Sequence, residues 1–265
     1  MIRGCQPTDN GQLILDQAER DELVSREPSA EEWIRPFSMG ADFINGKPRY
    51  CLWLKDASPK DLSSMPHVME RIRAVAAYRA QSTKAATRKK AETPWLFDEI
   101  RETGPSYIGV PKVSSGRRRY IPMGFVDNGM IPGDKLYFIP NASVYDFGIL
   151  MSQFHNAWMR MVAGRLKSDY SYANTIVYNN FVWPDPTDAA RAEVERCASA
   201  VLDARSSYEG CTLAEMYDPD NEFLYPALVR AHRALDAAVE AAYGVDFGGD
   251  EEMIVAHLFE LYAQK

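Results

Sequence analysis

The sequence has few of the residues and motifs that carry catalysis on their own. Four cysteines and four histidines are scattered through 265 residues, without the C-x-x-C spacing or the clusters that hold a metal ion. It contains no G-x-G-x-x-G, no G-x-x-x-x-G-K-[ST] and no G-x-S-x-G motif. The turns that bind dinucleotides or phosphates, or that present a nucleophilic serine, are therefore missing. These absences do not favour a self-sufficient enzyme, and they predict no cofactor or metal in this chain.

Long apolar runs are also missing. No segment approaches the roughly 18 apolar residues of a membrane helix, and "MIRGCQPTDNGQ" lacks the apolar centre of a signal peptide. The unpaired spacing of the cysteines favours reduced thiols and a cytoplasmic protein. Hydrophobic residues make up 46% of the chain and charged residues 25%, as in folded globular proteins. We therefore expect a folded protein without a membrane partner.

Charge is distributed unevenly, although the net value is only −7. Residues 60–119 contain 13 basic and 6 acidic side chains, a net of +7, whereas residues 184–265 contain 6 basic and 17 acidic side chains, a net of −11. The positive segment is either a solvated helix face or a surface for phosphates. The acidic segment would repel DNA, so we expect it to pack away from a duplex.

The order of elements predicts an α+β protein with a mixed or antiparallel curled sheet, packed helices and a helical end. Pro-rich "WPDPTD" separates a domain over 1–185 from a small all-helical C-terminal domain over 186–265. Within the first domain the hydrophobic patterns predict these elements: a helix after residue 15 with Ser29 as a cap, a hairpin over 41–54 turning at Asn45-Gly46, a helix over 64–94 capped by Ser64, a curled sheet over 106–140, a helix over 143–163, and a strand over 175–183.

The turn "KVSSGRRRYIP" is the strongest candidate for reading a DNA sequence. Arginines clustered at a hairpin tip suit bidentate contacts with guanine, each worth roughly 1–3 kcal/mol of discrimination, and serine hydroxyls can donate to phosphate oxygens. On a strand, Arg117 and Arg119 would share one face. The candidate residues of this turn are Lys112, Ser114, Ser115, Arg117, Arg118 and Arg119.

Other basic and polar residues are candidates for contacts with phosphates or bases. The second half of the 64–94 helix loses its apolar stripe and becomes basic, which indicates either a solvated helix end or a helix laid along a phosphate backbone. In "GRLKSDYSYANTIVYNNFVWP" we expect the segment 167–172 to face DNA. The candidates are Lys84, Arg88, Lys89 and Lys90 in the helix, Lys167 with Tyr170 and Tyr172 beside it, and Asn128 in the loop "DNGMIPGD" as a base-edge contact.

The tetrapeptide "YNNF" within that stretch is similar to the Asn-Pro-Pro-aromatic tetrad of adenine methyltransferases. It lacks both prolines, so we interpret it as part of a structural strand.

Several segments together identify a family. "RYCLWL", "AETPWLFDEIR", "PKVSSGRRRYIPMGF", "GILMSQFHNAWMRMVAGRLKSDYSYANTIVYNNF" and "LFELYAQK" resemble, in the same order, the C-terminal part of MmeI-like type IIL restriction–modification proteins and related class I S-adenosylmethionine-dependent DNA methyltransferases. The resemblance covers the target recognition domain and the helical C-terminal domain of that family. It departs from the family pattern at Gly116, where Glu or Asn is common, and at Val182, where proline is common.

The resemblance implies a double-stranded DNA partner and a catalytic domain outside this chain. An upstream N6-adenine methyltransferase domain of the same polypeptide, accompanied in many members by an upstream nuclease domain, would bind S-adenosylmethionine. Because Gly116 lies in the turn that reads the bases, the recognised sequence does not follow from the family. One alternative stays open: a non-catalytic interaction or scaffold domain whose acidic helices dock to a partner or to the methyltransferase core.

Overall fold

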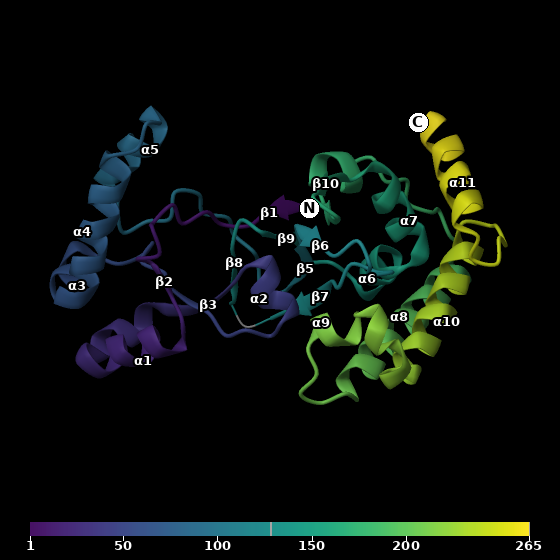
Figure 1. Cartoon of the computed structure of the whole chain (residues 1–265), viewed down its shortest axis with the longest axis horizontal. Helices are drawn as coiled ribbons and strands as arrows, with labels where there is room; N and C mark the ends of the chain where they lie inside the picture. The colour runs from purple at the N-terminus through teal and green to yellow at the C-terminus, as the bar shows by residue number, and fades with distance from the viewer. Residues whose placement is uncertain (128, 265) are drawn as a thin grey trace.

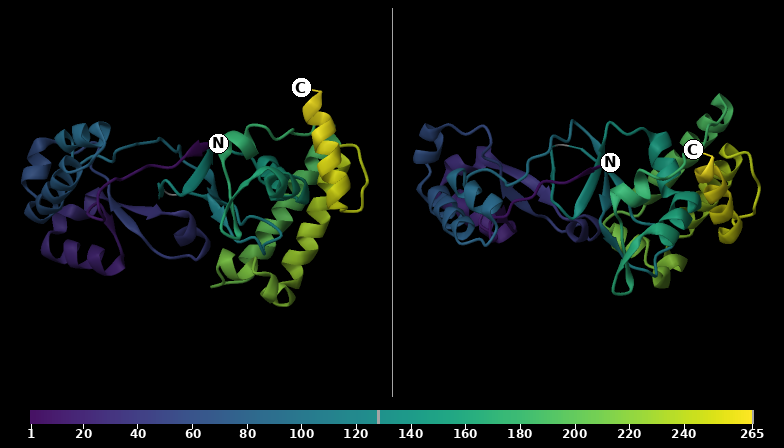
Figure 2. Two further views of the ribbon diagram at one scale, coloured as in Figure 1. Left: turned by 45° about the horizontal axis from the view of Figure 1, so that its top comes forward. Right: turned by 90° about the horizontal axis from the view of Figure 1, so that it is seen from above.

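The computed structural model describes residues 1–127 and 129–264, and it is an elongated molecule with two large hydrophobic cores and a small third cluster of Tyr107, Val126 and Phe138 (Figure 1). Most helices of the first 92 residues lie at one end and the C-terminal helices at the other, with the strands and the short helix Gly40–Ile44 between them, and the two further views show the same separation (Figure 2). No helix in the described ranges is long and apolar enough to cross a membrane.

The smaller core belongs to the N-terminal region. Its sheet has the order β2-β4-β3-β8, in which β8 runs parallel to β3 and the other pairs are antiparallel. Leu15, Phe37, Leu52, Val68 and Ile72 are among its buried side chains. The elements are β2 Ile14–Leu15, α1 Gln17–Arg26, η1 Pro28–Trp33, β3 Ile34–Ser38, α2 Gly40–Ile44, β4 Tyr50–Leu52, α3 Pro59–Ser63, α4 Pro66–Ala80, α5 Ala85–Lys89, η2 Lys90–Glu92 and β8 Ile131–Pro132.

The predicted hairpin over 41–54 is wrong. Gly46 does form a turn with a φ of 60°, but the run before it is helix α2, and β4 pairs with β3 instead. Tertiary packing explains the difference, because α2 places the Phe43 ring against Gly109 and Gly124, where the neighbouring strands have no side chain. A strand at this position would not seat that ring.

Two other predictions for this region need correction. Ser29 lies within the short helix η1 and is not a cap; α1 is instead capped by Asp16. The long helix over 64–94 begins at Pro66 after Met65, not after Ser64, and it breaks after Ala80 before α5 begins at Ala85. The helix ends there because residues 81–90 contain no buried residue, so no packed apolar face extends it.

The larger core contains the central sheet. Four antiparallel strands have the order β1-β9-β5-β7, with Ile108 opposite Ile139. Helix α6 begins at a Ser143 capping box, and Ser152 ends it and caps α7 by accepting a hydrogen bond from the His155 amide. The single helix predicted over 143–163 is therefore two helices. The elements are β1 Ile2–Arg3, β5 Tyr107–Pro111, β7 Gly124–Val126, β9 Leu136–Pro140, α6 Val144–Met151 and α7 Gln153–Val162.

A small three-stranded sheet and a π-helix follow. Strands β10 (Gly164–Leu166) and β11 (Asp169–Ser171) form a hairpin, and β11 also pairs with β6 (Val113–Ser114). The strand predicted over 175–183 is wrong, because Asn174–Tyr178 forms the π-helix η3. Val177 lies buried there and accepts a hydrogen bond from Trp158 Nε1 at 2.9 Å, so packing against α7 overrides the alternating pattern.

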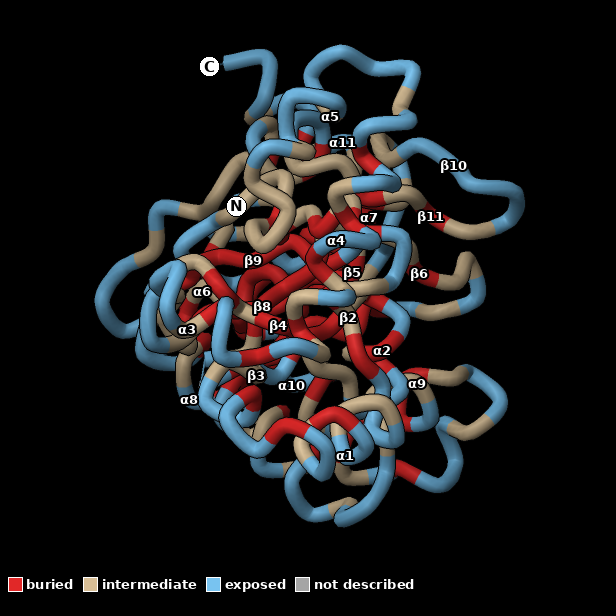
Figure 3. Tube along the Cα trace, turned by 90° about the vertical axis from the view of Figure 1, so that its left-hand side faces the viewer, coloured by how far each residue is buried: buried red, intermediate tan, exposed pale blue. Residues whose placement is uncertain are grey.

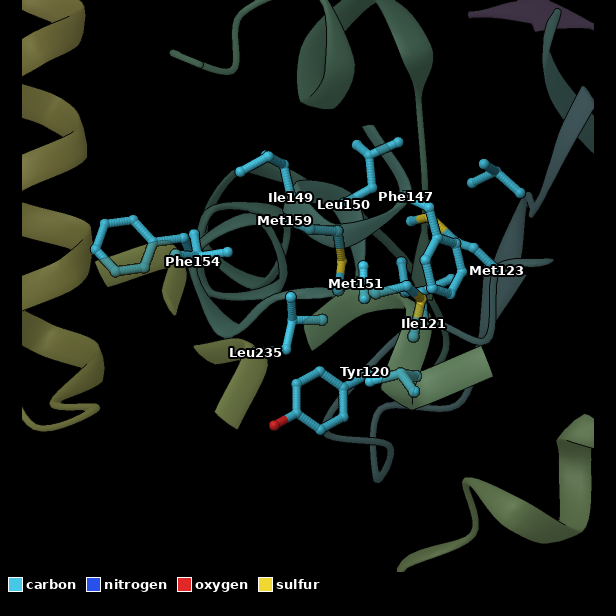
Figure 4. Packing of buried hydrophobic residues seen from close by; sticks show 14 of the residues in the cluster. Tyr120, Ile121, Met123, Phe147, Ile149, Leu150, Met151, Phe154, Met159 and Leu235 are labelled. Atoms are coloured by element: carbon cyan, nitrogen blue, oxygen red, sulfur yellow. The ribbon is translucent and has the colours of Figure 1, made fainter. Parts of the chain in front are cut away.

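The C-terminal helices complete the larger core. Their inward side chains share one cluster with the central sheet, and Leu235 lies among residues of α6 and α7 (Figure 4). At Gly148 a Cβ would lie 2.9 Å from Val194 Cγ1, so glycine lets α6 approach α8 closely. Residues 184–187 therefore mark a change in secondary structure within one core. The elements are α8 Asp188–Ser206, α9 Leu213–Met216, η4 Pro219–Leu224, α10 Pro226–Ala242 and α11 Glu251–Ala263.

Candidate nucleic-acid interface

The basic residues predicted in the 64–94 segment lie on the surface around α5. Lys84, Arg88, Lys89 and Lys90 are all exposed, and Figure 3 shows α5 exposed at the edge of the molecule. Among the described residues, no carboxylate lies within ion-pairing distance of Lys84, Arg88 or Lys89, whereas Lys90 Nζ is 4.0 Å from Asp98. Cations without carboxylate partners keep their charge available to phosphates.

The turn over residues 114–119, which the sequence predicts to read DNA and which we call the recognition turn, lies beside the tip of the β10–β11 hairpin. Ser114 pairs with Tyr170 in the three-stranded sheet, and a Cβ on Gly116 would lie 2.5 Å from the Ser168 carbonyl oxygen. Only glycine fits at this approach without movement of the backbone. Lys167 is exposed at the tip with a φ of 58°. The structure thus brings the predicted turn and Lys167, which are far apart in sequence, to one surface.

Two polar atoms in the turn have no hydrogen-bond partner among the described residues. These are Ser114 Oγ and Arg118 Nε, both buried. The Ser115 hydroxyl accepts a hydrogen bond from the Arg117 amide at 3.3 Å. Lys112 is half-buried, and its backbone donates to Lys135 and accepts from Tyr172. The turn is thereby attached to the sheet through its backbone.

The three arginines of the turn contact the C-terminal helices. Arg117 forms an ion pair with Asp220 in η4. Arg118 Nη2 lies 3.5 Å from the Ala214 carbonyl oxygen, and partial burial lowers its pKa. Arg119 donates to Gln153 Oε1 at 2.9 Å and lies 3.7 Å from Asp236.

The structure corrects one expectation for this turn. Residues 117–123 form no strand, so Arg117 and Arg119 do not alternate with Arg118 across a sheet. The acidic segment lies beside the turn, and its carboxylates pair with two of the three arginines. Contacts between these arginines and DNA would have to replace or share the carboxylate partners.

Tyr170 and Tyr172 are core residues, contrary to the expectation that they face DNA beside Lys167. Tyr170 is 6% exposed and Tyr172 1% exposed. The Tyr172 hydroxyl bonds to His155 Nε2 at 2.9 Å, and the Arg165 guanidinium covers the Tyr170 ring at 3.7 Å. The expectation was wrong because residues two apart on an extended strand point to the same face. Tyr170 in β11 and Tyr172 directly after β11 therefore both point into the core.

One exposed arginine was not among the predicted contacts. Arg165 lies in β10 opposite Tyr170, next to the turn at Gly116. The sequence could have indicated Arg165 as a contact, because it lies in "GRLKSD" only two residues before the predicted contact Lys167. The remaining predicted contact, Asn128, lies outside the described residues.

A buried polar cluster connects the recognition turn to α10. Tyr120 donates to Asp236 Oδ2 at 2.6 Å, and the Gln153 amide donates to Asp236 Oδ1 at 2.7 Å. Burial raises the pKa of Asp236 to about 6. The His232 ring stacks on Tyr120 at 4.1 Å, and burial keeps its pKa well below the usual value. The geometry of Tyr120, and of Arg119 before it, thus depends on a helix more than 100 residues later.

No group of three or more His, Cys, Asp or Glu side chains in the described part of the chain could hold a metal ion.

Comparison with known protein families covers the whole chain. The model of the MmeI target recognition domain matches residues 1–185. The model of the MmeI C-terminal domain matches residues 186–265. The chain belongs to the MmeI family. The predicted family is thereby confirmed, and so is the α+β fold, since its strands and helices match an MmeI structure almost throughout.

Two relatives of the MmeI family show how much of a longer protein this chain represents. It is 38% identical over 262 residues to DNA methyltransferase A of Bacillus subtilis (strain 168), covering 98% of this chain and 29% of that protein. It is 39% identical to the type IIL restriction–modification enzyme MmeI, solved in complex with DNA, with a TM-score of 0.96. That match covers 99% of this chain and 35% of the MmeI chain. The chain spans about a third of the length of these relatives.

Proposed function

We propose that this chain is the module that selects the DNA sequence for a site-specific DNA methyltransferase. The observation that carries the proposal is the likeness, along almost the whole chain, to an MmeI enzyme solved with DNA. Exposed cations around α5 and at Lys167 supply the charge that phosphate contacts require. The turn 114–119 supplies the Ser115 hydroxyl and the guanidinium groups that contact backbone and bases, whereas the Ser114 hydroxyl is buried.

The catalytic steps belong, in this proposal, to a methyltransferase domain upstream in the same polypeptide. That domain would bind S-adenosylmethionine and transfer its methyl group to N6 of an adenine, in a protein of the cytoplasm that in some relatives also cleaves DNA. The relative named DNA methyltransferase A, of which this chain covers 29%, supports this arrangement. The contribution of this chain would be to orient the duplex and choose the site.

Salt dependence of DNA binding tests the phosphate contacts. The logarithm of the affinity for duplex DNA should fall with the logarithm of salt concentration by about 0.9 for each phosphate bound. We expect Lys84→Gln plus Lys89→Gln to reduce this slope by about 1.8 if each lysine holds one phosphate. The matched control is Lys60→Gln, which removes an exposed lysine on α3. An unchanged slope in the double variant would remove the α5 surface from the proposal.

Methylation by the full-length protein tests sequence selection. Arg117→Ala plus Arg119→Ala should change or relax the methylated sequence, since each bidentate contact with guanine provides roughly 1–3 kcal/mol of discrimination. The measurement is a genome-wide map of methylated adenines for the variant and the wild type. The same sites methylated at the same relative rates would show that the turn does not read bases.

A further inference from the structure

Arg79, in the last turn of α4, uses its entire guanidinium group to bind backbone carbonyls. Its side chain is fully buried, at 0% exposure, and guanidinium has five N–H donors. All five are engaged, at 2.8 Å to Pro7 O, 2.9 Å to Thr8 O, 3.1 Å to Lys90 O, 3.2 Å to Thr93 O and 2.8 Å to Leu96 O. Among the described residues, no carboxylate accepts a hydrogen bond from it, so backbone carbonyls make all of its hydrogen bonds, while Asp98 and Asp9 stabilise the charge from a distance.

The five carbonyls belong to three chain segments that Arg79 holds together. One is the N-terminal segment at Pro7 and Thr8, where Thr8 has a φ of 45°. A β-branched residue rarely adopts that conformation unless its surroundings impose it. The second segment follows α5 at Lys90 and Thr93, and the third is Leu96. Lysine, with three donors on a point charge, could not donate to all five carbonyls.

The basic segment depends on such polar attachments. Helix α5 has five residues, none of them buried, and a helix this short is not stable by itself. Arg88 donates to the carbonyls of Ser82 and Thr83, both at 2.9 Å, which secures the segment before α5. The bonds from Arg79 to Lys90 and Thr93 secure the segment after it. The exposed cations therefore lie between two guanidinium attachments.

The same attachments shape a groove of about 640 Å³ beside the cations. Its lining includes Thr8, whose carbonyl binds Arg79, and residues 81–84, which lead into α5. Hydroxyl, amide and ammonium donors of this kind suit phosphate and sugar oxygens. The lining residues that carry such donors are Gln6, Thr8, Tyr78, Gln81, Ser82, Thr83, Lys84 and Thr87, whereas Asp98 and Glu99 add carboxylates that repel phosphates.

We propose that Arg79 is a positioning residue that holds Lys84, Lys89 and Lys90 in the geometry that binds the DNA phosphate backbone. This proposal rests on the proposed function, since it assumes that this chain binds DNA. Arg79 itself touches no phosphate, because its guanidinium is buried and fully occupied.

The test compares salt slopes for the 265-residue chain binding short duplexes of mixed sequence, which report phosphate contacts independently of base reading. We expect Arg79→Lys to lower the slope as far as Lys84→Gln plus Lys89→Gln plus Lys90→Gln does, by up to about 2.7. Combining both changes should add nothing further. Val194→Ala in the larger core is the control, since it destabilises the protein elsewhere and should leave the slope unchanged.

Each outcome is decisive. If the triple lysine variant lowers the slope while Arg79→Lys keeps the wild-type slope, the positioning role is overturned and DNA binding stands. If the triple variant keeps the wild-type slope, the α5 surface does not bind phosphates. Both the phosphate contacts proposed for α5 and the positioning role of Arg79 are then wrong. Hydrogen exchange then separates positioning from general unfolding, because amides of residues 84–93 in Arg79→Lys should exchange faster while those of the larger core do not.

If Arg79→Lys does not fold, a second variant, Arg79→Gln, tests the same proposal. Arg79→Gln, with a neutral amide, relieves the buried charge and should show the same loss of slope. If neither variant folds, the wild-type protein decides: DNA must slow exchange at residues 84–93, and unchanged exchange there would overturn the proposal.

Discussion

The two regions of this molecule present their positive charge in different ways. Around α5 in the N-terminal region, Lys84 and Lys89 are exposed, and no carboxylate among the described residues pairs with them. At the turn of the larger region, Arg117 and Arg119 contact Asp220 and Asp236 of the C-terminal helices. Free cations bind any phosphate within reach, whereas paired arginines gain only from a ligand that replaces their carboxylates well. The exposed cations around α5 suit attachment to DNA of any sequence, whereas the paired arginines of the turn suit discrimination between DNA sequences.

The separate cores provide the largest test of this comparison. Leu235→Ala in the larger core and Leu52→Ala in the smaller core should each lower the free energy of unfolding by about 2–5 kcal/mol, because each removes a fully buried side chain. We expect Leu235→Ala to increase hydrogen exchange in the turn 114–119 and to leave residues 66–89 protected. Leu52→Ala should do the reverse. Equal effects on both regions would show that the cores unfold as one unit.

Acid should weaken the larger region before the smaller one. Burial lowers the pKa of His155 to about 3 and that of His232 well below its usual value. Because both pKa values are lowered by folding, the neutral forms stabilise the protein above pH about 6.5, and this stability is lost as the pH falls through the folded pKa values. Each histidine should contribute a slope of about 1.4 kcal/mol per pH unit in that window.

Asp236 opposes this trend. Its pKa of about 6 is raised by folding, so its contribution is present below pH about 3.9 and is lost as the pH rises through about 6. Denaturant titrations from pH 4 to 7 check both statements. Asp236→Asn should steepen the loss of stability on acidification, and a gentler loss in that variant would contradict the assignment.

The smallest expected effect concerns the Arg117–Asp220 pair. Asp220→Asn removes a carboxylate that competes with DNA for Arg117, so affinity at low salt should rise by a few-fold at most, because the pair is exposed. Lys84→Gln should lower affinity, because no carboxylate competes there. Mobility-shift titrations measure both changes. An affinity that falls in Asp220→Asn would show that the ion pair holds the turn in its binding conformation.

Sequence patterns identified the elements whose own residues specify them. The helical spacing of Val194, Cys197, Ala198, Val201 and Leu202 predicts one apolar face on α8; the first four are buried and Leu202 is partly buried. The run Tyr107–Pro111 forms a strand, and Lys84 to Lys90 is an exposed basic segment. Local periodicity and charge were sufficient in these cases because burial and solvation act along each element separately.

Contacts between distant segments decided the rest. The Phe43 ring packs against two glycines from a helix where a strand was predicted, and Arg79 joins the end of α4 to the N-terminal segment through hydrogen bonds to Pro7 and Thr8. The Tyr172 hydroxyl hydrogen-bonds to His155 inside the core, so Tyr172 is buried and does not lie on the surface where it was predicted.

From its residues alone, the sequence determined the family, the α+β class and the segments that carry positive charge. Only the tertiary structure decided which arginines meet carboxylates, which tyrosines are buried and that the C-terminal helices share a core with the central sheet. The physical reason is that hydrogen bonds, ion pairs and close packing depend on the positions of both partners. A sequence pattern records only one partner at a time.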